Sequence, residues 1–133
     1  MAGILSASAY VPRYRLPRDL IAKEWGGAPA PGEKAVANHD EDSLTLAVNA
    51  AVGLGAGGER PDAVFFATTT SPYAEKQGAT TIAAVLDLPA TTRTLDFTDT
   101  LRAGTSATVR GGRRAADRVR LERRGFRRGV AHR

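Results

Sequence analysis

The stretch "LDFTDTLRAGTSA", residues 95–107, has the pattern of a strand end, a turn and the first turns of a small-residue helix. The N-terminal end of a helix stabilises developing negative charge, so enzymes place nucleophiles at such junctions. The chain contains no cysteine to serve as that nucleophile. Thr100 and Thr105 carry hydroxyls, but a hydroxyl without a paired base attacks poorly. The sequence therefore predicts a junction suited to nucleophilic chemistry that lacks its nucleophile.

A second group of hydroxyl side chains follows the apolar stretch "AVFFA". These residues are Thr69, Thr70 and Ser71, at the end of a predicted strand. Because α/β proteins bind ligands at the carboxyl ends of their strands, we expect these three residues to contact a substrate. Thr105, in the junction described above, is the fourth predicted substrate-binding residue.

The composition excludes several classes of site. With no cysteine, the chain has no disulfide, no thiolate metal site and no cysteine-based catalysis of its own. The two histidines, His39 and His132, lie far apart without ligand spacing, so we expect no metal site and no bound cofactor. There is no run of roughly 20 apolar residues and no charged leader segment, which predicts a cytoplasmic protein without a membrane segment.

The chain of 133 residues is long enough for one domain, and its pattern alternates strands and helices. Strands are expected over residues 3–10, 61–71 and 92–98, and a loop over residues 26–34. Helices are expected over residues 17–25, 39–54 and 74–88, with another starting near Thr100. This order predicts an α/β protein, βαβαβα, with a parallel sheet and right-handed crossovers. Trp25 is expected to pack against the domain rather than to bind a ligand.

Four stretches, in this order and spacing, resemble the N-terminal part of hydroxymethylglutaryl-CoA synthases and, more broadly, the ketoacyl synthase III-like branch of the thiolase superfamily. They are "GILSASAYVPRYRL", "DEDSLTLAVNAA", "AVFFATTTSPYAEKQGATTIAAVLDL" and "LDFTDTLRAGTSA". The similarity covers residues 3 to about 108. It implies a partial thiolase-like fold, an incomplete half-domain whose complete form binds acyl-CoA between two halves and usually dimerises.

The resemblance also implies where the catalytic residues of the family would lie. Leu101 occupies the position of the acylated cysteine, and Thr69 occupies the position of the glutamate. The half that carries the family histidine is missing from this sequence. Leu has no lone pair with which to attack a thioester, and Thr is no carboxylate base. No catalytic residue of the family is intact.

The resemblance therefore predicts a truncated hydroxymethylglutaryl-CoA synthase-like protein, related to acyltransferases and inactive by itself. The missing cysteine has two explanations: a branch with other chemistry such as retro-aldol cleavage, or decay of the site. One alternative is a non-catalytic interaction subunit of a thiolase-like/OB-fold complex. The other is a small basic binding protein.

The charge is unevenly divided along the chain. Residues 1–109 hold 9 Lys and Arg against 12 Asp and Glu, whereas residues 110–133 hold 10 Arg against 2 acidic residues. We therefore interpret residues 1–108 as the thiolase-like region and residues 109–133 as an Arg-rich tail, disordered or read from a shifted frame. An arm that binds nucleic acid is disfavoured, because no aromatic platform accompanies the arginines.

Overall fold

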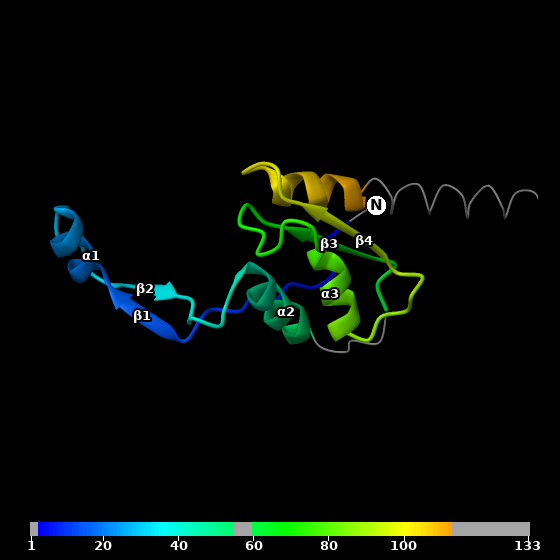
Figure 1. The fold of residues 1–133 in the computed structure, drawn as a ribbon, viewed down its shortest axis with the longest axis horizontal. Helices are drawn as coiled ribbons and strands as arrows, with labels where there is room; N and C mark the ends of the chain where they lie inside the picture. Colours follow the sequence, from blue (N-terminus) through cyan, green and yellow to red (C-terminus); the bar gives the residue numbers. More distant parts are fainter. Residues whose placement is uncertain (1–2, 55–59, 113–133) are drawn as a thin grey trace, which may run out of the picture. The chain divides into compact units, whose positions relative to one another are not determined.

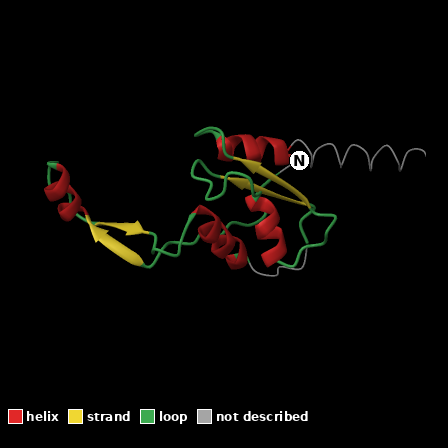
Figure 2. Ribbon diagram, in the orientation of Figure 1, coloured by secondary structure: helices red, strands yellow, loops and turns green. Residues whose placement is uncertain are grey.

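The computed structural model describes residues 3–54 and 60–112 of the 133-residue chain. It divides into two compact units (Figure 1). The α/β unit comprises the described residues 3–7 and 60–112, and the hairpin unit comprises residues 8–54. The elements in chain order are β1 (Tyr14–Pro17), α1 (Arg18–Trp25), β2 (Glu33–Val36), α2 (Ser43–Gly53), β3 (Ala63–Ala67), α3 (Gly78–Val85) and β4 (Arg93–Phe97). A last helix covers residues 103–112 (Figure 2).

The α/β unit is a β–α–β crossover followed by a second helix. β3 and β4 pair in parallel, from Ala63 opposite Arg93 to Ala67 opposite Phe97. β3 reads "AVFFA", a run of apolar and β-favouring residues without alternation, as expected for a strand covered on both faces. α3 connects the two strands, as parallel pairing requires. The parallel sheet predicted from the alternation of elements is confirmed in this unit.

Neighbouring residues of β3 contact different helices. A Cβ on Gly78 of α3 would meet the ring of Phe66, and a Cβ on Gly111 would meet the ring of Phe65. Since successive side chains of a strand point to opposite faces, α3 and the helix at residues 103–112 cover opposite faces of the sheet (Figure 1). The buried side chains of this three-layer arrangement are Phe66, Ala79, Ile82, Ala83, Ala103 and Ala107.

Small residues let both helices approach the strands closely. Ala103, Ala107 and Gly111 recur every four residues, so they lie along one face of the last helix. Ala79 and Ala83, four residues apart, lie along one face of α3, where Ala79 is fully buried. The edge-to-face contact between Phe65 and Phe97, with ring centroids 5.8 Å apart, links the two strands on the face of the last helix.

The hairpin unit begins with two short strands that enclose α1. β1 and β2 pair antiparallel, from Tyr14 opposite Val36 to Pro17 opposite Glu33. α1 starts directly after Pro17, whose fixed φ suits the residue before a first helical turn. It ends at Gly26, whose φ of +70° is the left-handed conformation that favours glycine at a helix end.

Three sequence predictions are wrong in the N-terminal part of the chain. Residues 3–10 form no strand. All are exposed to solvent, and the side chains of Ile4 and Leu5 are 86% and 96% exposed. A strand forms instead at β1, and β2 takes residues from the predicted loop 26–34. The β1–β2 pair is antiparallel rather than parallel. A strand is stabilised by backbone hydrogen bonds to a neighbouring strand. The small side chains of "SASA" bury too little surface to stabilise an extended conformation without such a partner.

α2 confirms the helix predicted over residues 39–54, but it begins at Ser43, after the acidic cluster, and its first turn has a complete capping box. The Asp42 carboxylate accepts the Thr45 backbone N–H at 2.8 Å, and the Thr45 hydroxyl accepts the Asp42 N–H at 2.7 Å. This hydrogen bond from the Thr45 backbone is the main cause that holds the pKa of Asp42 below its ordinary value. The helix ends at Gly53, and the glycines at 55–58 lie outside the described residues.

The predicted division at residues 108 and 109 stays a prediction. The helix of the α/β unit continues through residue 112, so the described chain shows no break at that point. The remainder of the predicted Arg-rich tail, residues 113–133, lies outside the described residues.

Candidate functional site

Two loops that carry the sequence-predicted site residues start at the same edge of the sheet. Because β3 and β4 are parallel, the segments after Ala67 and after Phe97 leave from neighbouring strand ends. The backbone N–H of Thr68 donates to the carbonyl of Phe97 at 3.0 Å, which continues the ladder one step into the first loop. The structure thus places Thr69 and Leu101 on adjoining loops at the carboxyl edge.

The first loop is ordered by its own hydroxyl groups. The Thr68 hydroxyl accepts the Thr70 N–H at 3.1 Å, and the Ser71 hydroxyl donates to the Tyr73 carbonyl at 3.0 Å. Thr69, Thr70 and Ser71 are all exposed. Such short-range bonds are typical of turns built by Ser and Thr, and they hold the loop in a defined shape. No carboxylate stands at position 69, so the loop offers hydroxyls and no general base there.

The second loop presents Leu101 to solvent. The side chain of Leu101 is 94% exposed, in a turn immediately before the helix that begins at residue 103. The Ala103 N–H donates to the Thr100 carbonyl at 2.9 Å, and this bond closes the turn. Thr105 lies one turn into the helix and is exposed. The strand–turn–helix junction predicted from the sequence is therefore present, with a hydrocarbon side chain at its tip.

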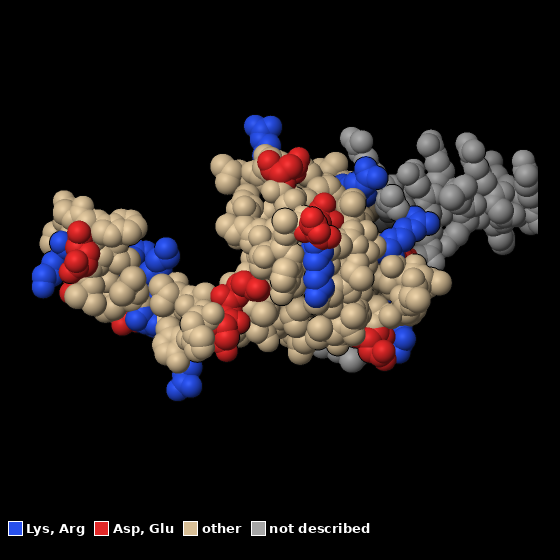
Figure 3. All heavy atoms as spheres, in the orientation of Figure 1, with Lys and Arg blue, Asp and Glu red and all other residues tan. Residues whose placement is uncertain are grey.

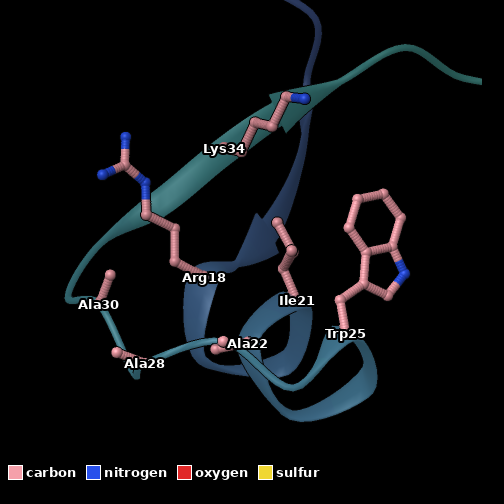
Figure 4. Close-up of a pocket in the computed structure, with 8 residues that line it drawn as sticks. Arg18, Ile21, Ala22, Trp25, Ala28, Ala30 and Lys34 are labelled. Carbon is pink, nitrogen blue, oxygen red and sulfur yellow. The ribbon is translucent and has the colours of Figure 1, made fainter.

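A separate pocket lies within the hairpin unit, and the sequence analysis missed it. It has a volume of about 400 Å³ and lies between α1, the loop that follows α1, and β2 (Figure 4). Figure 4 shows Ile21 and Trp25 on one side, with Arg18 and Lys34 extending from the helix start and from β2. The lining residues are Arg18, Ile21, Ala22, Trp25, Gly27, Ala28, Ala30 and Lys34.

The pocket combines an apolar floor with two cations and one aromatic ring. Neither Arg18 nor Lys34 forms an ion pair with any residue in the described ranges, so both charges are available to an anion. Trp25 is 86% exposed, and the prediction that it packs against the domain is wrong. The sequence feature that could have indicated the exposure of Trp25 is the Gly- and Pro-rich loop after α1. This loop turns back past the helix and leaves the last turn of α1 uncovered.

The described residues, 3–54 and 60–112, lack two further kinds of feature. This part of the chain brings together no group of three or more His, Cys, Asp or Glu side chains able to hold a metal ion. It also contains no helix with the length and apolar character needed to traverse a bilayer. On the face drawn in Figure 3, acidic and basic side chains are interspersed, and no single basic patch dominates.

Comparison with known proteins now bears on the predicted resemblance. No protein-family model matches the chain. The hydroxymethylglutaryl-CoA synthase of Methanocella arvoryzae is 36% identical over 115 residues, which cover 79% of this chain and 33% of that protein. The corresponding protein of Thermococcus gammatolerans is 39% identical over 110 residues, which cover 79% and 31%. The chain is hydroxymethylglutaryl-CoA synthase-like. It spans about a third of the length of the curated relatives it matches.

Solved structures give the same result for the fold. The structure described as MvaS in complex with 3-hydroxy-3-methylglutaryl coenzyme A matches with a TM-score of 0.77 and 25% identity, covering 88% of this chain and 31% of that one. A hydroxymethylglutaryl-CoA synthase complexed with CoA matches at 0.74 and 19%, covering 85% and 32%. A 3-oxoacyl-(acyl-carrier-protein) synthase III matches at 0.64 and 24%, covering 72% and 32%. The hydroxymethylglutaryl-CoA synthase-like chain thus has a partial thiolase-like α/β fold, as predicted.

Proposed function

We propose that this hydroxymethylglutaryl-CoA synthase-like chain binds acyl-CoA and does not by itself form an acyl-enzyme. The observation that carries the proposal is Leu101, exposed at the tip of the strand–turn–helix junction where the resemblance expects the acylated cysteine. The side chain cannot attack a thioester, and the chain contains no cysteine elsewhere to replace it. The activity left to this chain is binding.

The pocket of the hairpin unit has the chemistry that a CoA nucleotide requires. Arg18 and Lys34 provide two uncompensated cations for phosphate groups, and Trp25 provides an exposed ring for a base. Two of the structural neighbours hold CoA or 3-hydroxy-3-methylglutaryl coenzyme A. In this proposal acyl-CoA is the ligand, and neither a metal nor a bound cofactor takes part.

The hydroxyl groups at the carboxyl edge of the α/β unit suit contacts with an acyl group, and this assignment is independent of the pocket in the hairpin unit. Thr69, Thr70, Ser71 and Thr105 are exposed donors and acceptors. Hydroxyls at strand ends fix ligand orientation without supplying a base. We assign these four residues to contacts with the acyl group, in keeping with the sequence prediction.

Binding is tested by titrating the full chain with CoA while recording heat and Trp25 fluorescence. Trp25 is the single tryptophan, so the fluorescence reports on the pocket. We expect the Arg18→Ala and Lys34→Ala variants each to weaken binding about 10- to 100-fold, because charge-assisted hydrogen bonds contribute about 1.5–3 kcal/mol. Lys23→Ala is the matched control, since Lys23 is an exposed cation on the same helix that does not line the pocket. Equal affinity in the wild type and both pocket variants would contradict this site.

The absence of acyl-enzyme chemistry is tested separately by mass spectrometry. After incubation with acetyl-CoA, we expect the wild-type mass to be unchanged. A Leu101→Cys variant should react quickly with iodoacetamide, because position 101 is exposed. A stable acetyl adduct on the wild-type chain would disprove the inactive state and leave the binding result intact.

Partners and location belong to the same proposal. We infer a cytoplasmic protein that associates with a second copy or with a thiolase-like/OB-fold partner, as the family resemblance implies. Binding of nucleic acid is not part of it. Light scattering of the purified chain distinguishes a dimer from a monomer that needs another protein.

A further inference from the structure

α3 begins without a capping side chain from its own segment. The side chain of Gln77, the residue before the helix, accepts the Thr80 hydroxyl but no backbone N–H of the first turn. The first N–H groups of a helix have no partner inside the helix, so in a half-buried position they must find one elsewhere.

A single carboxylate on β4 provides that partner. The Gly78 N–H donates to Oδ2 of Asp96 at 2.6 Å, and the Ala79 N–H donates to Oδ1 at 2.8 Å. Both oxygens are used, one for each amide. Negative charge at a helix N-terminus is stabilising, and hydrogen bonds to a charged acceptor are stronger than neutral ones.

A neighbouring residue of β4 strengthens the same connection. The Thr94 hydroxyl donates to Oε1 of Gln77 at 2.9 Å, and Nε2 of Gln77 donates to the Thr94 carbonyl at 3.2 Å. Thr94 and Asp96 are two apart on the strand, so their side chains point to the same face, toward α3. The strand therefore holds the helix start at three consecutive residues, 77 to 79.

The close approach depends on glycine at the first helical position. A Cβ on Gly78 would lie 2.6 Å from Cδ1 of Phe66, a buried side chain. Glycine removes this clash and lets the backbone come within hydrogen-bonding distance of Asp96.

The geometry points to Asp96 as a positioning residue: it caps α3 from the neighbouring strand and thereby fixes the loop of residues 68–77. β4 holds this loop at both ends, since the Thr68 N–H donates to the Phe97 carbonyl and Gly78 binds Asp96. The loop carries Thr69, Thr70 and Ser71. Its relevance to the acyl group rests on the proposed function, whereas the capping role rests on these contacts alone.

The capping role has a consequence for ligand binding. The N-terminus of a helix is a common place for phosphate to bind. In α3 the Asp96 carboxylate already accepts the Gly78 and Ala79 N–H groups, so neither of these two donors is free for a phosphate. Removing Asp96 should create an anion site that the wild type lacks.

This expectation gives an experiment on the full chain with Asp96→Ala, Asp96→Asn and, as the matched control, the exposed Asp99→Ala. Thermal melts are recorded in sodium formate and in sodium chloride of equal ionic strength, and amide exchange is followed over residues 68–79. We expect Asp96→Ala to lower the melting temperature by about 5–10 °C. Exchange at Gly78, Ala79 and the loop should accelerate about 5- to 30-fold.

Formate should restore part of the lost melting temperature in Asp96→Ala and have no such effect on the wild type or Asp99→Ala. Asp96→Asn retains one carbonyl acceptor, so its loss of melting temperature and its faster exchange should be intermediate. If the alanine variant does not fold, the same measurements are made on Asp96→Asn. Uniformly faster exchange throughout the chain, or equal melts in formate and chloride, would overturn the capping role. Absence of CoA binding to the wild type, together with faster exchange at residues 68–79 in Asp96→Ala, would instead count against the proposed function and leave the capping role intact.

Discussion

The α/β unit and the hairpin unit are stabilised in different ways. Six of the seven buried hydrophobic side chains among the described residues lie in the α/β unit, and Leu44 of α2 is the other. α1 has no buried residue at all. The hairpin unit depends mainly on backbone pairing, a left-handed glycine and a capping box.

The difference shows where a rigid site and an adaptable site can form. Strand ends held between two packed helices keep the loops at Thr68 and Thr100 in defined positions, because close-packed interiors resist deformation. The pocket beside Trp25 has little buried surface behind it, so its shape depends on a few hydrogen bonds.

The largest effect is expected for Phe66→Ala. Phe66 is 4% exposed and contacts α3, so the variant should lose about 3–5 kcal/mol of stability through lost burial and a cavity. Urea titration monitored by circular dichroism measures the change. Leu101→Ala is the control, and its loss should stay within about 0.5 kcal/mol because the side chain is exposed. Similar losses in both variants would mean that the α/β unit has no core of this kind.

A smaller effect is expected for Gly78→Ala. The new Cβ would clash with the Phe66 ring, and overpacking of this sort costs about 1–3 kcal/mol. Gly104→Ala is a matched control in the last helix, where a Cβ has no atom within 4 Å. There the substitution should stabilise the protein by up to about 1 kcal/mol, because alanine favours helix. Denaturant midpoints that move in the same direction would contradict the predicted contrast.

In the hairpin unit, Asp42→Asn should cost about 0.3–1 kcal/mol at neutral pH, because Asn keeps a capping oxygen but removes the negative charge from the N-terminus of α2. The folded pKa of Asp42 lies below the unfolded one, so its carboxylate contributes stability above about pH 4, and this contribution is lost as pH falls through the folded pKa. Urea titrations of both proteins at pH 7 and pH 3 should show the difference shrinking in acid. Asp40→Asn, an exposed neighbour, serves as the control. A stability difference between the wild type and Asp42→Asn that is larger at pH 3 than at pH 7 would contradict this prediction.

The smallest effect on stability is expected for Trp25→Ala. The ring is 86% exposed, so thermal melts should change by no more than the equivalent of about 0.5 kcal/mol. Calorimetric titration with CoA should nevertheless show weaker binding, if the ring contacts the ligand as proposed. A clear loss of stability would show that Trp25 packs against the protein after all.

The sequence predicted the α/β unit well, because its local signals agree with one another. The apolar run at Phe65 and Phe66 indicated a strand covered on both faces, and the spacing of Ala79, Ile82 and Ala83 indicated a buried helix face. The junction at Leu101 was also found from its pattern of small residues. Each of these signals lies within one continuous segment.

The hairpin unit was predicted less well. Residues 3–10 look like a strand in isolation, but strand formation depends on a partner that no local pattern identifies. The pairing of Tyr14 with Val36 connects segments on either side of α1, and neither has a strong alternating pattern. The exposure of Trp25 likewise follows from the path of the loop after α1.

The sequence by itself determined that this chain has no thiol for acyl transfer, that helices follow both strands of its α/β unit, and which family it resembles. Only the tertiary structure decided that β1 pairs antiparallel, that Arg18 and Lys34 flank one pocket, and that Asp96 caps a helix 17 residues before it in the chain. The physical reason is that residue chemistry and helical periodicity are local properties. Strand pairing and long-range hydrogen bonds depend on which distant segments meet, and that is settled by packing of the whole unit.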